Sequence, residues 1–356
     1  MSVLDRQPPS TESTPVSGYA ALAREIRQAG LMRRRPGFYS GMLAVNLTVL
    51  GGVVTAMAFL QHSWWLIAMA LALAVVSTQI AFFAHDAGHR QIARKAGHSA
   101  VLGLIHANLL NGFSYGWWIG KHNAHHAHPN DLAADPDVHP GVLVFDADEA
   151  AARRGWGAWL TRHQAWLFFP LLLLEALNLH VSSIRALAKS GIRHRAVELL
   201  LIGLHLAAYA ALLITTMTWL QAIVFVTVHQ GLLGVYLGCS FAPNHKGMPT
   251  LTGEEAADPL LRQVLTSRNV RGGPLTDVVL GGLNYQIEHH LFPSMPRANL
   301  RRAQLVIRRF CAEHDISYAE TSLVTSYGQV LQCLHEVGAP LRQLAATGTT
   351  AGNAGR

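Results

Sequence analysis

Charged side chains are scarce in this chain of 356 residues. Asp, Glu, Lys and Arg together make up 14% of the sequence, whereas hydrophobic residues make up 50% and the mean hydropathy is +0.23. Because a soluble domain usually contains about a quarter charged residues, this balance indicates a membrane protein. The net charge of +7 comes mainly from basic residues that flank apolar runs. We therefore expect contact with a membrane face and no nucleic-acid partner, since no aromatic and basic nucleic-acid-binding module is present.

Cysteine is scarce as well, and no apolar leader opens the chain. Cys239, Cys311 and Cys333 lie too far apart for a disulfide framework or a cysteine-based metal site. The first 35 residues are polar, contain three prolines and lack the apolar core of a secretory signal. We predict that residues 1–35 form a cytosolic N-terminal segment, disordered to about residue 18 and continuing as a basic surface helix over 19–35.

Two apolar hairpins follow. Residues 39–60 contain no charged side chain and, at about 20 residues, are long enough to cross a bilayer. After a short break, a second apolar run over 64–83 opens with two tryptophans, which are typical of the membrane interface. Basic residues flank the pair of runs but are absent from the loop between them, so the positive-inside rule predicts that both ends are cytosolic. Residues 197–213 and 220–241 repeat this pattern.

Two further apolar stretches are less suited to crossing a bilayer. Residues 99–119 are interrupted by polar side chains, and residues 166–179 form a run of only 14. We expect both to lie on the membrane surface or to re-enter it, and an additional full span is the alternative. The prediction is an all-α integral membrane protein with four transmembrane helices in two hairpins, interfacial helices and a cytosolic helical cap. Its membrane domain covers 36–336, and a disordered tail covers 337–356.

Histidine, in contrast, is abundant, with twenty residues. Residues 284–293 read Asn-Tyr-Gln-Ile-Glu-His-His-Leu-Phe-Pro. On a helix, Gln286, His289 and His290 stand at positions i, i+3 and i+4 and share one face. Histidine is a poor core residue and a modest helix former, so metal ligation is the obvious reason for such a pair. That interpretation requires partners elsewhere in the chain.

Two more motifs and one further histidine supply those partners. Residues 122–126, His-Asn-Ala-His-His, repeat the i, i+3, i+4 spacing, and residues 85–89, His-Asp-Ala-Gly-His, place histidines at i and i+4. His245 follows the fourth apolar run. All of them fall on the cytosolic side if neither 99–119 nor 166–179 crosses the membrane singly. The sequence thus predicts eight metal ligands on one membrane face, namely His85, His89, His122, His125, His126, His245, His289 and His290.

The size of this set indicates two metal ions. A catalytic zinc ion typically takes three protein ligands, so eight imidazoles exceed the need of one ion. Imidazole suits iron, zinc, copper or nickel. Hydrolytic zinc sites usually place a glutamate base beside the ligands in an HExxH motif, and that motif is absent. An oxygen-activating di-iron site explains the pattern best, and a membrane zinc hydrolase and a non-catalytic transporter or metal-storage protein remain alternatives.

The three motifs HDAGH, HNAHH and QIEHHLFP, with these separations and two hydrophobic hairpins, resemble the three histidine boxes of membrane fatty acid desaturases. The resemblance covers residues 38–309, and the Gln-x-x-His-His third box resembles the acyl-lipid, front-end-like branch and its bacterial relatives. It implies a four-span helical protein with a cytosolic di-iron cap. A further histidine after the fourth span also ligates in the family, and His245 matches its placement. Gln286 occupies a position that is often histidine in the wider family, so its role as a ligand stays open.

The resemblance also implies an activity. Such an enzyme uses O2 and two electrons to remove two hydrogens from adjacent methylenes of a fatty acyl chain and introduces a cis double bond. The implied cofactors are two iron ions, which supply the oxidant, while the protein positions the chain in an apolar tunnel. A hydroxylase or ketolase of the same histidine-rich superfamily shares this oxidant and is the alternative.

Six further side chains are candidates for a direct or supporting role at the metals. Asp86, Asn123 and Glu288 alternate with the predicted ligands and could accept hydrogen bonds from imidazole N–H groups. The turn from Asp135 to Asp137 follows the second motif and could brace it. The candidate set comprises Gln286, Asn244, Asp86, Asn123, Glu288 and His128.

The expected partners follow from the resemblance. Many front-end desaturases carry a fused haem-binding cytochrome domain with a His-Pro-Gly-Gly signature, which residues 139–142, His-Pro-Gly-Val, only superficially echo. We therefore expect no fused domain and a separate electron donor, a ferredoxin or similar protein with its reductase. The acyl substrate is expected in the membrane, carried by CoA, acyl carrier protein or a lipid. We expect an integral protein of the bacterial plasma membrane with its termini and active site in the cytosol.

Overall fold

The computed structural model describes residues 18–138, 141–189 and 191–344. The disorder predicted for residues 1–17 and for the end of the chain from 345 falls outside these ranges, as do the first two residues of the His-Pro-Gly-Val stretch.

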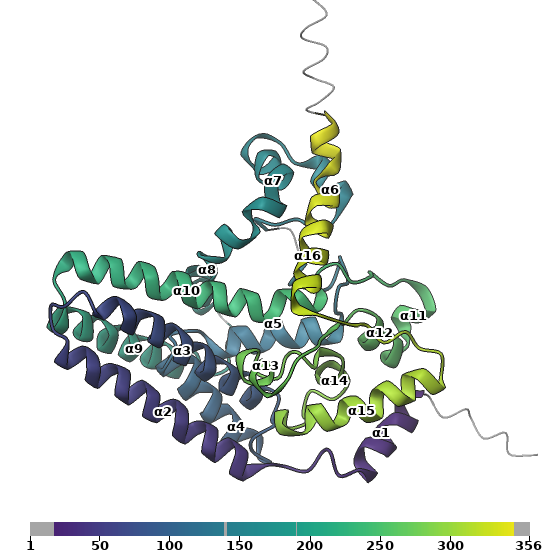
Figure 1. Ribbon diagram of the computed structural model, residues 1–356, viewed down its shortest axis with the longest axis horizontal. Coiled ribbons are helices and arrows are strands. Elements are labelled where there is room, and N and C mark those ends of the chain that lie inside the picture. Colours follow the sequence, from purple (N-terminus) through teal and green to yellow (C-terminus); the bar gives the residue numbers. More distant parts are fainter. Residues whose placement is uncertain (1–17, 139–140, 190, 345–356) are drawn as a thin grey trace, which may run out of the picture.

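Four long helices run side by side and form the body of the molecule (Figure 1). They are α2 (Pro36–Phe59), α3 (Leu66–Gly88), α9 (Arg195–Thr216) and α10 (Trp219–His245). Each is long and apolar enough to cross a membrane. Large apolar side chains such as Leu200 on α9 remain exposed, as a helix surface that faces lipid requires. The prediction of four spans in two hairpins is confirmed.

The two hairpin turns lie at the same end of this bundle. The side-chain amide of Gln221 at the start of α10 donates to the backbone carbonyl of His62, 2.7 Å away. The His62 amide in turn donates to the carbonyl of Thr216 at 2.9 Å. Consequently the beginnings of α2 and α9 and the ends of α3 and α10 all lie at the opposite end, where the histidine motifs stand.

The polar run predicted between the hairpins does not form one continuous helix. It divides into α4 (Ala96–Gly103), the π-helix η1 (Leu104–Leu109) and α5 (Tyr115–Ala127). The polar side chains that made it unsuitable for lipid are buried in protein, since Asn111 donates to the carbonyl of Ser77 at 3.1 Å. The sequence-based expectation that 99–119 is not a simple span is confirmed.

The second doubtful run is broken as well. It belongs to α7 (Gly155–Leu172) and α8 (Glu175–Ala188), which meet at an angle of 84°. A pair bent this way is a re-entrant segment or one broken span, so both interpretations of 166–179 stay open. The bend packs directly on α10, because a Cβ added at Gly234 would lie 2.4 Å from the carbonyl oxygen of Leu172 and 2.9 Å from the amide nitrogen of Ala176.

Replacing Gly234 with alanine should therefore destabilise the protein. The obstructing atoms are backbone atoms that cannot rotate away, and overpacking of this kind typically costs about 1–3 kcal/mol. The control is Gly203→Ala on α9, where nothing lies within 4 Å of the new Cβ and the better helix propensity of alanine favours the folded state. The midpoint of thermal denaturation in detergent measures both changes, and equal midpoints for the two variants would contradict the close approach of α8 and α10.

Short helices gather beyond the histidine end of the bundle and form a cap (Figure 1). A two-residue parallel pair, β1 (Asn269–Val270) with β2 (Glu320–Thr321), joins two of its segments. The helices α6 (Ala147–Ala152) and α16 (Leu323–Val337) stand with α7 on one side. The cap helices are α1 (Gly18–Gln28), α11 (Gly253–Ala257), α12 (Pro259–Leu265), α13 (Pro274–Val279), α14 (Gln286–Leu291) and α15 (Arg297–Glu313).

Two predictions at the ends of the chain need correction. The helix predicted over 19–35 ends at Gln28; its basic side chains Arg24 and Arg27 are exposed, while Leu22 and Ile26 are fully buried in one core with residues of α14 and α15. The tail predicted from 337 begins too early, since the described chain stays helical over 339–344 and Leu341 is buried. In α1, apolar side chains one helical turn apart find a tertiary partner.

Candidate metal centre

The structure brings all eight predicted histidines together. Two stand at the end of α3, three on α5, one at the last residue of α10 and two on α14. Helical spacing turns the members of each motif toward one another, and the antiparallel bundle delivers α3 and α10 to the same end. Their rings lie in mutual contact, with centroids 4.7 Å apart for His89 and His289 and 4.6 Å apart for His125 and His245.

The ligand nitrogens form two groups. Within each group the potential ligand atoms lie within 4.8 Å of one another. His126 lies between the groups, with its Nε2 atom 3.1 Å from Nε2 of His122 and its ring stacked on His290 at 4.1 Å between centroids. This arrangement offers two adjacent metal positions. The first group is His85, His89, His122 and His289, and the second is His125, His245 and His290.

Oxygen acceptors hold the outer nitrogens of four of these rings. Because each acceptor takes a hydrogen bond from Nδ1–H, the proton stays on Nδ1 and the lone pair of Nε2 faces the other histidines. The Nδ1 contacts are 3.2 Å from His85 to Asp86, 2.9 Å from His125 to Asp135, 3.1 Å from His245 to the carbonyl of Thr266 and 2.9 Å from His290 to the Gln263 side chain.

The inner nitrogens fit a metal better than they fit one another. Nε2 of His245 lies 3.3 Å from Nε2 of His125 and 3.0 Å from Nε2 of His290, although all three are acceptors when their Nδ1 atoms carry the protons. Nε2 of His85 and of His289 is buried without a hydrogen-bond partner. Bound cations would satisfy both the facing lone pairs and the unpartnered atoms, so these residues fit a pair of metal ions.

The electrostatics of the site favour neutral imidazoles. Desolvation by the surrounding protein, together with neighbouring histidines, lowers the pKa values well below the ordinary range. This holds for His89, His122, His126, His289 and His290. Only the neutral ring can ligate a metal, so the site is prepared for binding without the release of protons from these residues.

Among the six supporting candidates, Asp86, Gln286 and Asn244 lie at the centre. Asp86 contacts His85 as described, and the Gln286 side-chain nitrogen lies 2.8 Å from Nε2 of His245. The buried Asn244 amide donates to the Gln286 oxygen at 3.2 Å and so orients it.

Glu288, Asn123 and His128 lie elsewhere. Glu288 is fully buried but faces away from the rings, because its oxygens accept from the Asn269 amide and the Tyr318 hydroxyl, each at 2.7 Å. Burial raises its pKa to about 7. Asn123 and His128 are exposed on α5 and at its end. The prediction that Glu288 and Asn123 accept from imidazoles is wrong, because Asn269 and Tyr318 occupy the Glu288 oxygens and Asn123 is exposed.

Two side chains hold rings of the second group, Asp135 at His125 and Gln263 at His290, and only the first was predicted from the sequence. Asp135 was expected from its place after the second motif, and it also accepts from the amides of Asn130 and Asp137 at 2.8 Å each. Gln263 on α12 was missed; besides holding His290 it donates to the carbonyl of His126 at 2.8 Å. It lies far from every histidine motif along the chain, and no local pattern marks it.

A socket of side chains fixes the beginning of α5, the helix with three of the histidines. The buried carboxylate of Glu198 on α9 accepts from the Ser114 hydroxyl at 2.6 Å, from the amide of Gly116 at 3.0 Å and from Asn108 at 3.0 Å. Ser183 on α8 accepts from the Ser114 amide at 2.9 Å. The free N–H groups of the first helical turn are thereby satisfied, and the anionic carboxylate complements the helix dipole.

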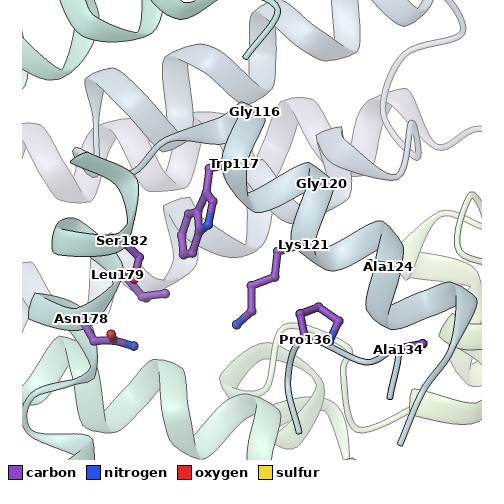
Figure 2. Close-up of a pocket in the computed structure, with 10 residues that line it drawn as sticks. All are labelled: Gly116, Trp117, Gly120, Lys121, Ala124, Ala134, Pro136, Asn178, Leu179 and Ser182. Carbon is purple, nitrogen blue, oxygen red and sulfur yellow. The ribbon is translucent and has the colours of Figure 1, made fainter. Parts of the chain in front are cut away.

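A cavity of about 620 Å³ lies between α5 and α8, on the face of α5 that carries Trp117 and Lys121 (Figure 2). Trp117 and Lys121 point into it from α5, and Asn178 and Ser182 line it from α8. The Lys121 ammonium is paired with Asp137 at 2.7 Å, which raises the pKa of this lysine. None of the site histidines is among the lining residues, so the cavity is separate from the metal centre.

Comparison with known proteins agrees with this architecture. The profile of the fatty acid desaturase family matches residues 62–322. An acyl-lipid (9-3)-desaturase of Borago officinalis is 29% identical over 75% of this chain and 62% of its own length. A Delta(8)-fatty-acid desaturase of Helianthus annuus is 26% identical, over 92% and 74% of the two chains. The Delta(5) fatty acid desaturase fat-4 of Caenorhabditis elegans is 29% identical over 87% and 71%. Since the profile match covers most of the chain and all three histidine motifs, the chain belongs to the fatty acid desaturase family.

Proposed function

We propose that this protein is an integral membrane enzyme that desaturates a fatty acyl chain with O2 at a di-iron centre. The seven histidines of the two groups and His126, which lies between them, would hold the two iron ions. The observation that carries the proposal is the convergence of the ring nitrogens in two groups, while oxygen acceptors hold the Nδ1 atoms of His85, His125, His245 and His290. Gln286 faces His245 and is proposed as an additional ligand or as a donor that orients the ligands.

The reaction converts two adjacent methylenes, O2, two electrons and two protons into a cis double bond and two water molecules. Bound iron would supply the oxidant that unactivated C–H bonds require. The chain's own part is to keep the imidazoles neutral, fixed and shielded from water. Asp86 and Asp135 hold two of the rings, and Gln263 and the carbonyl of Thr266 hold two more.

Substrate, donor and orientation are part of the same proposal. The exposed apolar surface of the four long helices supports a substrate that is dissolved in the membrane. Electrons would come from a ferredoxin or similar protein with its reductase. Basic residues at the histidine end of the bundle support a cytosolic active site. The relatives reported above come from plants and a nematode, so the bacterial plasma membrane remains a prediction.

The direct test is expression in a host that lacks the activity, together with a ferredoxin and its reductase, followed by analysis of total fatty acids and localisation of any double bond. We expect a new unsaturated acyl species that requires O2, and about two iron ions in each purified chain. An empty vector is the control.

Three results would contradict the proposal. Unchanged lipids despite an iron-loaded protein and a competent donor would exclude desaturation of the host's acyl chains. A hydroxylated product would identify a hydroxylase. Bound zinc with an activity that needs no O2 would identify a hydrolase.

A further inference from the structure

Arg297 at the start of α15 reaches from the cap to the end of α3. One guanidinium nitrogen lies 2.8 Å from Oδ2 of Asp86 and donates to the carbonyl of Phe82, also at 2.8 Å. The Arg297 side chain is 8% exposed and that of Asp86 2%, so the ion pair is buried. A buried ion pair of this kind contributes little net stability compared with an apolar pair, but loss of one partner leaves a strongly unfavourable charge behind.

The position of this arginine is closely determined. Its backbone amide donates to the Tyr39 hydroxyl at 3.2 Å and to the Gln91 side chain at 3.1 Å. Its aliphatic stem packs on Gly282, where an added Cβ would lie 2.5 Å from Cγ of Arg297. The guanidinium is therefore presented to Asp86 by a rigid support and not by a flexible surface side chain.

Asp86 transmits this contact to a predicted ligand. Its other oxygen, Oδ1, lies 3.2 Å from Nδ1 of His85, and Nε2 of His85 is one of the buried unpartnered atoms of the first histidine group. Arg297, Asp86 and His85 thus form a continuous series from the cap to the first metal position. The carboxylate of Asp86 contacts the His85 ring with one oxygen and forms the ion pair with Arg297 through the other.

The second group is braced differently. Asp135, the acceptor for His125, takes its other hydrogen bonds from the neutral backbone amides of Asn130 and Asp137. The carboxylate of Asp137 lies further from the same ring, 3.6 Å from Nδ1 of His125. The nearby ammonium of Lys121 pairs with Asp137. The two metal positions are therefore supported by different chemistry, and only the first has a fixed guanidinium behind its acceptor carboxylate.

We infer that Arg297 is a positioning residue for the first metal position, acting through Asp86 on His85, and that it has no comparable effect on the second position. The inference rests on the proposed di-iron centre. Changes to a direct partner of a ligand, such as Asp86, typically weaken metal affinity by about 10–100-fold, and Arg297 acts one step further out through that partner. Removal of the guanidinium should therefore affect one ion of the two.

The experiment measures iron bound by the purified full-length protein in detergent, by titration with Fe(II) under anaerobic conditions and by elemental analysis. We expect wild type to retain two ions and Arg297→Gln to retain one tightly, with the other weakened by about 10-fold, the lower end of that range, because Arg297 acts through Asp86. Arg297→Lys keeps the charge and should recover part of the loss. The matched control is Arg301→Gln, one turn further along α15, which removes a half-exposed arginine paired with Asp277 at 3.1 Å and should leave both ions bound.

Combining Arg297→Gln with a variant that lacks one ligand of either histidine group identifies which ion is affected. When His85→Ala has already disabled the first group, Arg297→Gln should cause no further loss, whereas with His290→Ala it should remove most of the remaining iron. Asp86→Asn should reproduce the selective loss, and adding Arg297→Gln to it should change little. It also serves as the second variant if Arg297→Gln does not fold.

The possible outcomes separate the two proposals. Equal weakening of both ions, or effects of Arg297→Gln and Asp86→Asn that simply add, would show that Arg297 only supports the fold and would overturn the inference. Two tightly bound ions in Arg297→Gln would overturn it as well, while leaving the di-iron centre intact. A wild-type protein that binds no iron would contradict the proposed function itself, and the inference with it.

Discussion

Replacing His125 with alanine should reduce the formation of unsaturated product to the background of the empty host. His125 belongs to the second histidine group, with its Nε2 atom 3.3 Å from Nε2 of His245 and its Nδ1 atom 2.9 Å from Asp135. Loss of an outer partner alone typically costs about 10–100-fold, so loss of a ligand should exceed about 100-fold. Fatty acid analysis of cells that express equal amounts of wild type and variant measures the effect.

The chain offers a close control for this experiment. His128 stands three residues further on, at the end of the same helix, and is exposed. His128→Ala should retain wild-type product levels and both iron ions, whereas His125→Ala should lose the second ion. Unchanged unsaturation in His125→Ala would favour a non-catalytic role such as metal storage.

Replacing Glu198 with alanine should destabilise the protein strongly. The Glu198 carboxylate accepts hydrogen bonds from Ser114, Gly116 and Asn108, and its removal leaves two buried donors and one partly buried donor without a partner. Each such donor costs about 1–3 kcal/mol, so we expect a loss of at least about 3 kcal/mol. Because the socket fixes the beginning of α5, bound iron should fall together with the midpoint of thermal denaturation.

Glu198→Gln tests the origin of that effect. The glutamine amide keeps one acceptor oxygen but places an N–H group where an acceptor is needed. The midpoint of thermal denaturation of Glu198→Gln should therefore lie between those of wild type and Glu198→Ala. Glu255→Ala, which removes an exposed glutamate of α11, should leave the midpoint unchanged. If Glu198→Ala denatures at the same temperature as this control, the socket does not stabilise α5.

Local patterns were sufficient for the spans and for the membership of the histidine set. An apolar run of about 20 residues is long enough to cross a bilayer, and within lipid a helix satisfies all of its backbone hydrogen bonds. Histidines at i, i+3 and i+4 share a face in any helix, as they do on α5 and α14. That rule does not decide what a residue between two ligands does, because Asp86 contacts His85 whereas Glu288 faces Asn269 and Tyr318.

Contacts between distant segments could not be read from such patterns. The Arg297 guanidinium meets Asp86 across more than two hundred residues, and Gln263 reaches His290 from a helix without any histidine. The burial of α1 depended on a partner surface on α15 that its own amphipathic sequence does not identify. Each of these contacts depends on how two segments pack against each other, which the sequence of either segment alone does not specify.

The sequence by itself therefore determined the four spans, the eight candidate ligands and the family. These depend on periodicity, run length and motif spacing, which act within one segment. Only the tertiary structure decided how the histidines divide into two groups, which side chains hold each ring and what fixes the beginning of α5. Those features arise because the bundle brings α3, α5, α10 and α14 to one place, where side chains from separate segments complete one another's hydrogen bonds.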